Sequence, residues 1–159
     1  MRISLDWVSD YLPTNLSLTE VSERLTATGL EVEKAEVFDA VPGGLRHVVV
    51  GEVRSLRQHP NADRLRVTQV DVGAPEWLNI VCGAANVAQG QKVAVAMVGA
   101  ELHPWGSDSA LVIKKSALRG EASEGMICAE DELGLGSNHD GIMVLSPDAP
   151  VGQPMTAAN

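Results

Sequence analysis

Basic side chains cluster in two segments of the chain, and residues of this type bind phosphate groups. The first segment, residues 46–66, contains two acidic residues and five arginines, Arg46, Arg54, Arg57, Arg64 and Arg66. In the second segment, Lys114, Lys115 and Arg119 lie within six residues. Because arginine and lysine neutralise phosphate charge, a surface that joined both segments would be locally positive. The alternative is that these residues are scattered, solvated charges on the faces of strands.

The chain as a whole has the opposite charge. Its 159 residues include 12 Lys and Arg against 21 Asp and Glu, a formal net charge of −9. Acidic residues follow the second basic segment closely, at Glu121, Glu124 and residues 130–132. Negative charge beside a phosphate path opposes binding. The composition therefore excludes a globally basic nucleic-acid binder and leaves room only for a local positive patch.

The residue types of an enzyme active site do not occur in the spacing that catalysis would need. No glycine-rich phosphate loop is found, and the four histidines and two cysteines lack the paired spacing of a zinc site. Ser116 and Ser123 have no evident His or Asp partner. Residues 130–132 could hold a hard cation, although such an acidic run is more typical of an exposed helix end. We predict no catalytic residue, no metal site and no cofactor in this chain.

The composition is typical of a globular chain. Hydrophobic residues make up 45% and aromatic residues 3%, which is enough apolar content for one domain or two small ones. No run approaches the ~20 apolar residues that span a bilayer, and no signal segment opens the sequence. Two cysteines are too few for a disulfide framework, so a reduced, cytoplasmic chain without membrane contact is expected.

The first forty residues predict a small α+β unit. Residues 7–12 have helical spacing up to Pro13, and Ser17 with Glu20 has the spacing of a capping box. The second helix is expected to end at Gly29, where the pattern changes to the alternation of a strand reaching about Phe38. The segment 41–44, Val-Pro-Gly-Gly, is the natural boundary, giving domains of residues 1–40 and 41–159.

The second domain is predicted to be almost entirely β. Short alternating segments separated by turn residues indicate a small barrel or sandwich. A short helix could fit near residues 85–87 or 130–133, and residues 147–159 have the composition of a linker. The expected strands are residues 48–56, 65–72, 78–82, 93–98, 111–113 and 142–145.

Longer motifs in the same order suggest a family. The segments are MRISLDWVSDYLP (1–13), GLEVE (29–33), VVVGEVRSLRQHPNADRLRVTQVDVG (48–73), IVCGAANVAQGQKVAVAMVGAEL (80–102) and IKKSALRGEASEGMICAEDELGL (113–135). Together they resemble the start of the β subunit of bacterial phenylalanyl-tRNA synthetases, including its tRNA-binding OB-fold domain. The OB-fold module is similar to appendages of methionyl-tRNA synthetases and to free-standing tRNA-binding proteins. The most specific segment is 113–135.

The resemblance implies a mainly β fold, a small OB-fold barrel preceded by the α+β unit. It also implies that the chain is a non-catalytic N-terminal fragment of a cytoplasmic synthetase. The parent would be an α2β2 phenylalanine–tRNA ligase that uses ATP and Mg2+ and whose α subunits carry the catalytic centre. The fragment itself would hold no cofactor, and its partner would be tRNA.

Seven residues are candidates for contact with tRNA: Arg54, Arg64, Lys114, Lys115, Arg119, Ser123 and Met126. Arg119, on a loop before Gly120, is the best single phosphate contact. Lys114 and Lys115 are expected in one strand, so only one could face a groove. Ser123 and Met126 enter through the resemblance alone. Ser123 could instead be a turn hydroxyl bonded to backbone, and Met126 could pack in the core.

Recognition of tRNA shape and backbone is expected rather than base stacking, because Trp77 and Trp105 are the only aromatic residues of the second domain. The acidic neighbours predict weak, salt-sensitive affinity. An alternative is a structural docking module within the synthetase that barely touches RNA. A free-standing RNA-binding protein or chaperone on the same barrel is disfavoured, because it gives residues 1–38 no role.

Overall fold

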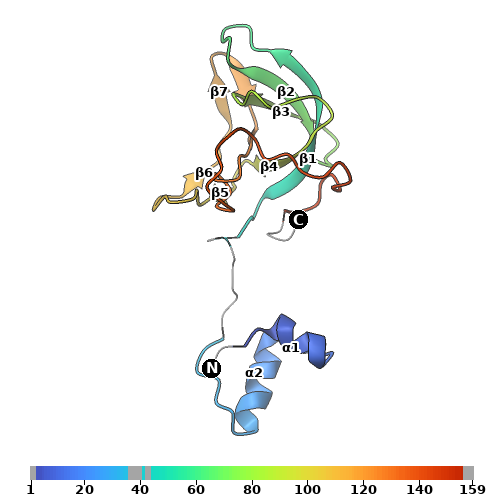
Figure 1. Ribbon diagram of the computed structural model, residues 1–159, viewed down its shortest axis with the longest axis vertical. Helices are drawn as coiled ribbons and strands as arrows, with labels where there is room; N and C mark the ends of the chain where they lie inside the picture. Colours follow the sequence, from blue (N-terminus) through green and yellow to red (C-terminus); the bar gives the residue numbers. More distant parts are fainter. Residues whose placement is uncertain (1–2, 36–40, 42–43, 156–159) are drawn as a thin grey trace. The chain divides into compact units, whose positions relative to one another are not determined.

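The computed structural model describes residues 3–35, 41 and 44–155, which belong to two compact units, Met1–Phe38 and Asp39–Asn159 (Figure 1). Residues 42 and 43 of the predicted boundary at residues 41–44 lie outside the described residues. Within the described ranges, no helix has the length and apolar character needed to cross a membrane.

Two helices make up the regular structure in the described part of the first unit, α1 (Leu5–Tyr11) and α2 (Leu18–Ala27). The capping box predicted from the sequence is confirmed, because the Ser17 N–H donates to Glu20 Oε2 at 2.8 Å and the Glu20 N–H donates to Ser17 Oγ. The hydrogen bonds that Ser17 donates lower the pKa of Glu20. Gly29 follows the helix at φ +90°, the left-handed conformation that commonly ends a helix.

The strand expected at residues 30–38 is absent from its described part. Residues 30–35 have no regular secondary structure, and residues 36–38 lie outside the described ranges. A strand needs a neighbouring strand to satisfy its backbone groups, and the described part of this unit offers only helices. The alternation of Leu30 and Val32 with glutamates therefore does not form a strand here.

The second unit is a nearly closed antiparallel barrel. Five strands pair in the order β3 (Leu78–Cys82), β2 (Arg66–Asp71), β1 (Val48–Gln58), β4 (Lys92–Met97) and β9 (Gly125–Ile127). Two small hairpins complete it, β5 (Glu101–Leu102) with β6 (Leu111–Val112) and β7 (Ser116–Leu118) with β8 (Glu121–Ser123). The predicted mainly β chain with a small OB-type barrel is confirmed.

The long strand β1 makes the barrel possible because it serves two neighbours. Its first half pairs with β4 and its second half with β2, and a register shift lies between Val53 and Ser55. At Gly51 the side chains of Val95 and Val70 fill the space beside the backbone. A Cβ would lie 2.6 Å from Val95 Cγ2 and 2.9 Å from Val70 Cγ1, so only glycine fits. The gap between edge strands β3 and β9 is bridged where Glu124 N–H donates to Asn79 O at 2.8 Å.

Strand β4 is buried on both faces and joins two hydrophobic clusters. Val93 and Val95 pack in the cluster of Ile80 and Ile127. Ala94 and Ala96 pack on the other side, in a second cluster to which later segments contribute Leu102, Leu133 and Met155. The continuous apolar sequence of this strand, rather than strict alternation, reflects burial on two sides.

Three expectations for the second unit are corrected. Residues 142–145 form an isolated bridge, Val93 with Val144, because their backbone N–H groups bond to different partners, Cys128 O and Lys92 O. Residues 147–155 are not a linker, since Met155 is 4% exposed and pairs with the start of β1. Residues 85–87 and 130–133 form turns rather than helices. Residues 156–159 lie outside the described ranges.

Candidate nucleic-acid interface

The two basic segments of the sequence meet where the loop at residues 59–65 contacts the β7–β8 hairpin. His59 begins this loop and is only 2% exposed. Its Nδ1 accepts a hydrogen bond from the Asn61 N–H at 3.0 Å, so the ring proton is on Nε2, which donates to Leu118 O at 2.9 Å. His59 therefore fastens the loop to β7. We call the surface formed by residues 59–65 and 114–124 the loop–hairpin edge (Figure 1).

Arg119 is held at the turn of this hairpin in an unusual backbone conformation. Its φ is +50° and that of Gly120 is +95°, as in the two-residue turns that match the twist of paired strands. Gly suits this conformation, whereas Arg in it is strained by about 1–3 kcal/mol. The Arg119 Nη1–H donates to Asn61 O at 3.2 Å, and the Asn61 amide donates to Arg119 O at 3.3 Å. The remaining N–H groups of the guanidinium are available to a ligand.

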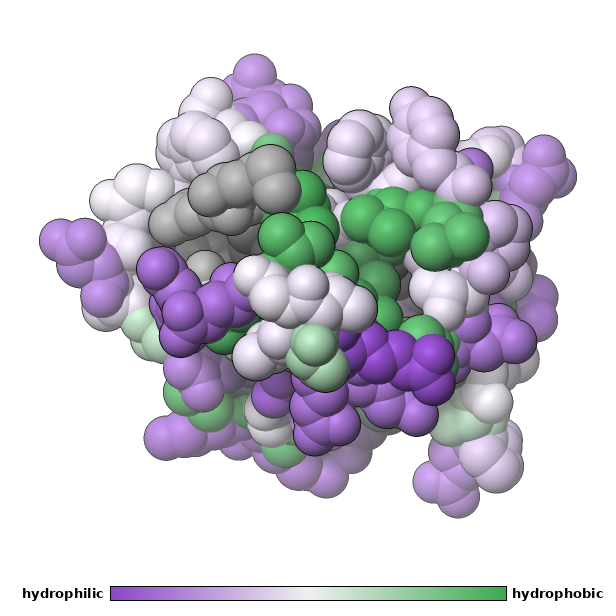
Figure 2. All heavy atoms as spheres, turned by 90° about the horizontal axis from the view of Figure 1, so that it is seen from below, coloured by the Kyte–Doolittle hydropathy of each residue, from purple (hydrophilic) through white to green (hydrophobic). Residues whose placement is uncertain are grey.

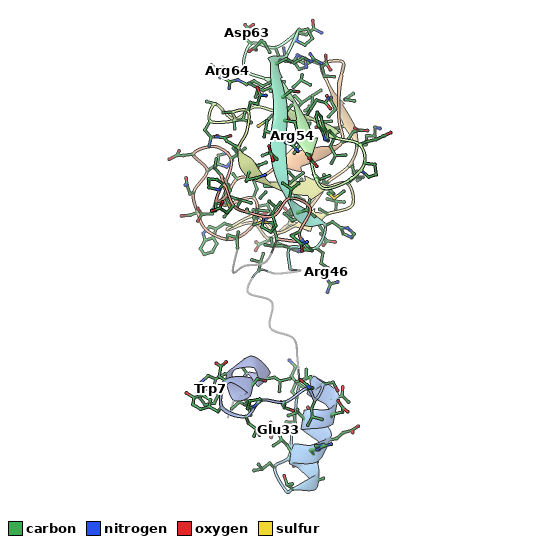
Figure 3. All side chains as sticks on the ribbon, turned by 90° about the vertical axis from the view of Figure 1, so that its right-hand side faces the viewer. Trp7, Glu33, Arg46, Arg54, Asp63 and Arg64 are labelled. Atoms are coloured by element: carbon green, nitrogen blue, oxygen red, sulfur yellow. The ribbon has the colours of Figure 1, made fainter. Side chains whose placement is uncertain are left out.

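Two further basic residues of the edge are unpaired. Arg64 and Lys114 are exposed, and neither makes an ion pair within the described residues. The Asp63 carboxylate also lacks an ion pair there. Figure 3 shows Asp63 and Arg64 together at one end of the barrel, with Arg46 at the opposite end. The basic residues of 46–66 therefore do not form one continuous patch.

Lys114 and Lys115 do not share a strand, contrary to the prediction. They lie in the connection between β6 and β7, because Ile113 ends the pairing with the preceding chain by bonding Ala100 O and Gly99 N. Lys115 Nζ lies 2.6 Å from Glu124 Oε1, and this contact lowers the pKa of Glu124. Lys115 is thus paired, whereas Lys114 is not.

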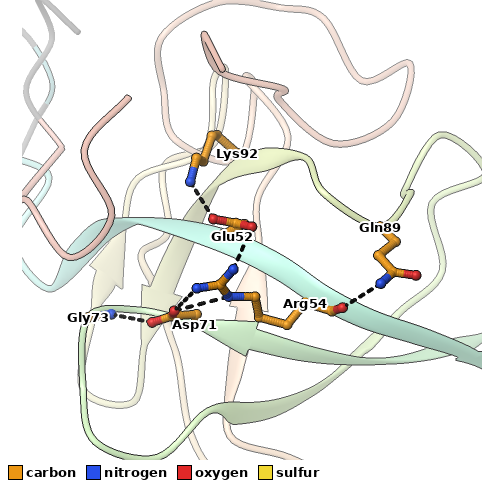
Figure 4. Close-up of polar contacts among 6 residues, drawn as sticks. All are labelled: Glu52, Arg54, Asp71, Gly73, Gln89 and Lys92. Carbon is orange, nitrogen blue, oxygen red and sulfur yellow. Dashed lines mark hydrogen bonds and ion pairs between the residues drawn. The ribbon is translucent and has the colours of Figure 1, made fainter. Parts of the chain in front are cut away.

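Arg54 lies away from the edge, in a charge network on the outside of the sheet (Figure 4). Its guanidinium donates to Asp71 Oδ2 at 2.9 and 3.1 Å and to Glu52 Oε1 at 2.9 Å, and Lys92 also pairs with Glu52. The Lys92 hydrogen bond lowers the pKa of Glu52, while the Gly73 N–H and then Arg54 lower that of Asp71. Two cations and two carboxylates leave this network neutral.

Ser123 and Met126, the two residues taken from the resemblance, face the barrel rather than its surface. Ser123 is 3% exposed; its hydroxyl accepts from the Val81 N–H at 3.1 Å and donates to Gly125 O at 3.1 Å. It therefore supplies a hydrogen bond across the gap between β3 and β9. Met126 is partly buried against the cluster of Cys128 and Leu133. Both positions match the structural alternatives weighed for them.

The sequence did not show which basic residues the acidic residues of the edge pair with, nor that Asn61 bonds to Arg119. Glu121 lies 2.8 Å from Arg57, and Glu124 pairs with Lys115. One signal was present in the sequence. An Arg-Gly pair at a two-residue turn fixes the register of the hairpin that it joins. In this hairpin Ser116 pairs with Ser123. The next residues outward, Lys115 and Glu124, therefore lie across from each other.

No other chemistry is assembled in the described residues. They contain no group of three or more His, Cys, Asp or Glu placed to hold a metal ion. The thiols of Cys82 and Cys128 are buried, and burial raises the pKa of Cys128 to about 12, which makes it a poor nucleophile at neutral pH. His139 pairs with Asp131 at 2.8 Å, which raises the pKa of His139.

Comparison with known families identifies the barrel. Residues 48–154 match the family described as "Putative tRNA binding domain", and the chain belongs to this family. It is 51% identical over 154 residues to the phenylalanine–tRNA ligase β subunit of Porphyromonas gingivalis and 49% identical over 159 residues to that of Salinibacter ruber. Each match covers 97% of this chain and 19% of the relative. The resemblance found in the sequence is confirmed, and the chain spans about a fifth of the length of these curated relatives.

Solved structures give weaker similarities. The C-terminal domain of Plasmodium vivax p43 is 25% identical with a TM-score of 0.47, covering 67% of this chain and 57% of that one. A MetRS related protein from Pyrococcus horikoshii is 21% identical with a TM-score of 0.49, covering 68% and 87%.

Proposed function

We propose that the barrel binds tRNA as an auxiliary, non-catalytic domain of a phenylalanine–tRNA ligase β subunit, and that the loop–hairpin edge is its contact surface. The observation that carries this proposal is the mutual hydrogen bonding of Asn61 and Arg119. It joins the two basic segments and holds the strained Arg119 where its charge is not neutralised. Backbone strain that is retained at one exposed basic residue is typical of a functional site.

The contacts would be made with the RNA backbone rather than with bases. Three unpaired basic residues of the edge, Arg64, Lys114 and Arg119, can each neutralise a phosphate. Stacking on bases requires exposed aromatic rings at the same surface. Trp77 and Trp105 lie outside the loop–hairpin edge: the Trp77 ring is 5.7 Å from the Arg54 guanidinium, and Trp105 belongs to the connection between β5 and β6. Binding through a few phosphates alone is weak and falls steeply with salt.

Arg119→Asn tests this proposal without loss of the hairpin. Asparagine adopts the left-handed conformation more readily than arginine and is favoured beside glycine in such turns. We expect an unfolding midpoint at least as high as that of the wild type. We also expect an affinity for a tRNAPhe transcript about three- to tenfold lower at low salt, as for loss of one phosphate contact. Thermal denaturation and a fluorescence titration measure the two quantities.

Arg54→Met is the matched control, because it removes an arginine that two carboxylates already neutralise. Its RNA affinity should stay within about twofold of the wild type. Equal losses in both variants would assign the effect to net charge, and unchanged binding in Arg119→Asn would contradict the proposed surface.

The parent enzyme and its other components belong to the same proposal. The relatives are named as ligase subunits, and we infer a cytoplasmic parent that joins phenylalanine to tRNA with ATP and Mg2+, with α subunits completing an α2β2 assembly. Nothing in the described residues fits ATP or Mg2+, since they contain neither a glycine-rich phosphate loop nor a group of metal ligands. Those groups would be bound by other parts of the parent.

A second function, protein docking, is favoured by the first unit. None of the residues of α2 is buried, and large apolar side chains are more than half exposed at Ile3, Trp7, Tyr11, Leu12 and Leu30. The rings of Trp7 and Tyr11 meet edge to face at 5.4 Å. In the view of Figure 2, hydrophobic side chains lie at the surface among hydrophilic ones. A patch of this kind is typical of a protein interface, and we propose that it packs on another part of the β subunit.

Co-purification tests the docking function. This chain would be expressed together with the remainder of a β subunit and the α subunit, and we expect a complex that survives in Arg119→Asn but is weakened in the double variant Trp7→Ala/Tyr11→Ala. Failure of the wild-type chain to form a complex would reject docking and leave the RNA-binding proposal standing.

A further inference from the structure

Two ion pairs flank the unpaired cations of the loop–hairpin edge. Arg57, on β1, lies 2.8 Å from Glu121, the first residue of β8. Lys115, just before β7, lies 2.6 Å from Glu124, just after β8. Both cations belong to the segments that bring basic charge to this edge, and each is held by an acidic residue of the same hairpin.

We propose that Glu121 and Glu124 set the RNA affinity of the edge by occupying Arg57 and Lys115, so that an RNA phosphate gains either cation only by displacing a carboxylate. This inference rests on the proposed function, because it concerns the same surface. The two glutamates are then affinity-determining residues. The edge together with the adjacent Arg57 has five cations, of which Arg64, Lys114 and Arg119 are not paired with a carboxylate in the described residues.

The exposure of the two cations makes such an exchange possible. The side chains of Arg57 and Lys115 are 55% and 66% exposed, so that a phosphate can reach both cations. Ion pairs at this degree of exposure are weak, because water screens them and ordering two long side chains costs entropy. A phosphate oxygen forms the same kind of charge-assisted hydrogen bond as a carboxylate oxygen. Exchange of one for the other therefore gains little net free energy.

Glu124 is the more firmly placed of the two carboxylates. Its Oε2 accepts a hydrogen bond from the Asn79 N–H at 3.4 Å, and the hydrogen bond from Lys115 helps keep it ionised by lowering its pKa. Glu121 is bonded only to Arg57 among the contacts of its side chain in the described residues. Release of Glu121 should therefore be easier than release of Glu124.

In the Arg54 network, by contrast, a phosphate could not easily replace the carboxylate partners of the cation. Its guanidinium is bonded to two carboxylates and lies over the Trp77 ring. A phosphate would have to replace three partners there at once. At the edge, each cation has one carboxylate partner.

Glu121→Gln and Glu124→Gln test the inference in the full chain, with a tRNAPhe transcript titrated at several KCl concentrations. Each change frees one cation, and the amide oxygen introduced by Glu124→Gln can still accept the Asn79 N–H. We expect each to raise the affinity about three- to tenfold at low salt. Each should also steepen the dependence of log K on log salt by about 0.7–0.9, the value for one added phosphate contact. Their effects should combine in the double variant.

Two further variants separate release of a cation from a change in net charge. Asp148→Asn removes one negative charge at an exposed residue outside the edge and should change the affinity by less than about twofold. Arg57→Gln/Glu121→Gln removes a pair together, so its affinity should return close to that of the wild type.

The outcomes distinguish this inference from the function on which it rests. If the wild type binds and Arg119→Asn weakens binding, but the glutamate variants behave like Asp148→Asn, the inference is overturned and the proposed function stands. If neither the wild type nor the double glutamate variant binds at low salt, both are overturned. A gain in affinity with a steeper salt dependence supports both.

Discussion

The sheet face around Arg54 and the loop–hairpin edge around Arg119 both carry arginine, but only the edge leaves its charge available. Arg54 is bonded to Glu52 and Asp71, with Lys92 completing a neutral set of four. In the described residues, the Arg119 guanidinium bonds only to the backbone oxygen of Asn61. The number of basic residues on a surface therefore does not show whether that surface can bind an anion. What matters is whether each basic side chain is already paired with a carboxylate.

Strand register causes the difference between the two regions. Glu52 and Asp71 are cross-strand neighbours, and Arg54 lies two residues beyond Glu52, at the register shift between Val53 and Ser55. From there its guanidinium bonds both carboxylates. At a hairpin turn the chain reverses and each side chain has fewer neighbours. The charge of Arg54 on the sheet face is neutralised by the fold, whereas the charge of Arg119 at the hairpin turn is not paired with a carboxylate in the described residues.

The largest expected effect is a loss of stability when Ser123 is replaced. Its buried hydroxyl joins β3 to β9 by hydrogen bonds. Ser123→Ala leaves the buried Val81 N–H without its acceptor, and we expect a loss of roughly 1–3 kcal/mol in the free energy of unfolding. RNA affinity, measured well below the unfolding midpoint, should be unchanged. Urea denaturation measures the first quantity. Its cross-strand neighbour Ser116 is exposed, so Ser116→Ala is the control and should cost less than about 0.5 kcal/mol.

A smaller effect is expected when unpaired cations are removed from the edge. Arg64→Gln and Lys114→Gln should each lower the affinity for tRNA about two- to fivefold. Each should also reduce the slope of log K against log salt by about 0.7–0.9, because each removes one phosphate contact. Stability should be unaffected, since neither side chain makes an ion pair in the described part of the chain. A larger loss of tRNA affinity in Arg54→Met than in these variants would mean that the sheet face around Arg54, and not the edge, contacts the RNA.

Acid should weaken the sheet face through Glu52 and Asp71. Their pKa values are lowered in the folded protein. Their contribution to stability is therefore present above the ordinary values of 4.5 and 3.8, and it is lost as the pH falls through the folded values. Unfolding midpoints between about pH 3 and pH 6 should fall less on acidification in Glu52→Gln than in the wild type. Parallel curves for the two proteins would show that this pair does not contribute.

The smallest effect is expected for Arg54→Met on RNA binding, which should not be detectable beyond about twofold. The same variant should lower the unfolding midpoint slightly, because Glu52 and Asp71 lose a shared partner. A change in affinity without a change in midpoint would mean that the network opens when RNA binds.

Local features of this fold were predictable from sequence because they depend on neighbouring residues. Ser17 and Glu20 placed the second helix, and the alternating segments placed the first four barrel strands within about two residues. The strands at 116–118, 121–123 and 125–127 were missed, since three residues are too few to show a period. The strand expected after Gly29 failed because alternation does not supply a pairing partner.

The candidate site was predictable in composition but not in geometry. The basic segments and Arg119 are visible in the sequence, whereas the neutralisation of Arg54 depends on a cross-strand register that no local pattern encodes. Ser123 illustrates the same limit: a resemblance can mark a residue, but only the fold shows that its hydroxyl bonds across the gap between two strands.

The contact between the first strand and the last described segment of the barrel affects how the protein can be synthesised. The Met155 N–H donates to Val48 O at 2.9 Å, and Met155 packs in the cluster of Leu102 and Leu133. On the ribosome, this cluster cannot be completed until Met155 has left the exit tunnel. The cluster of Ile80 and Val95 needs no residue beyond Ile142 and can form earlier. We therefore expect late, non-local closure on the millisecond-to-second scale of β barrels. Until that moment the nascent chain exposes the faces of β1 and β4 that carry Val48, Val50, Ala94 and Ala96.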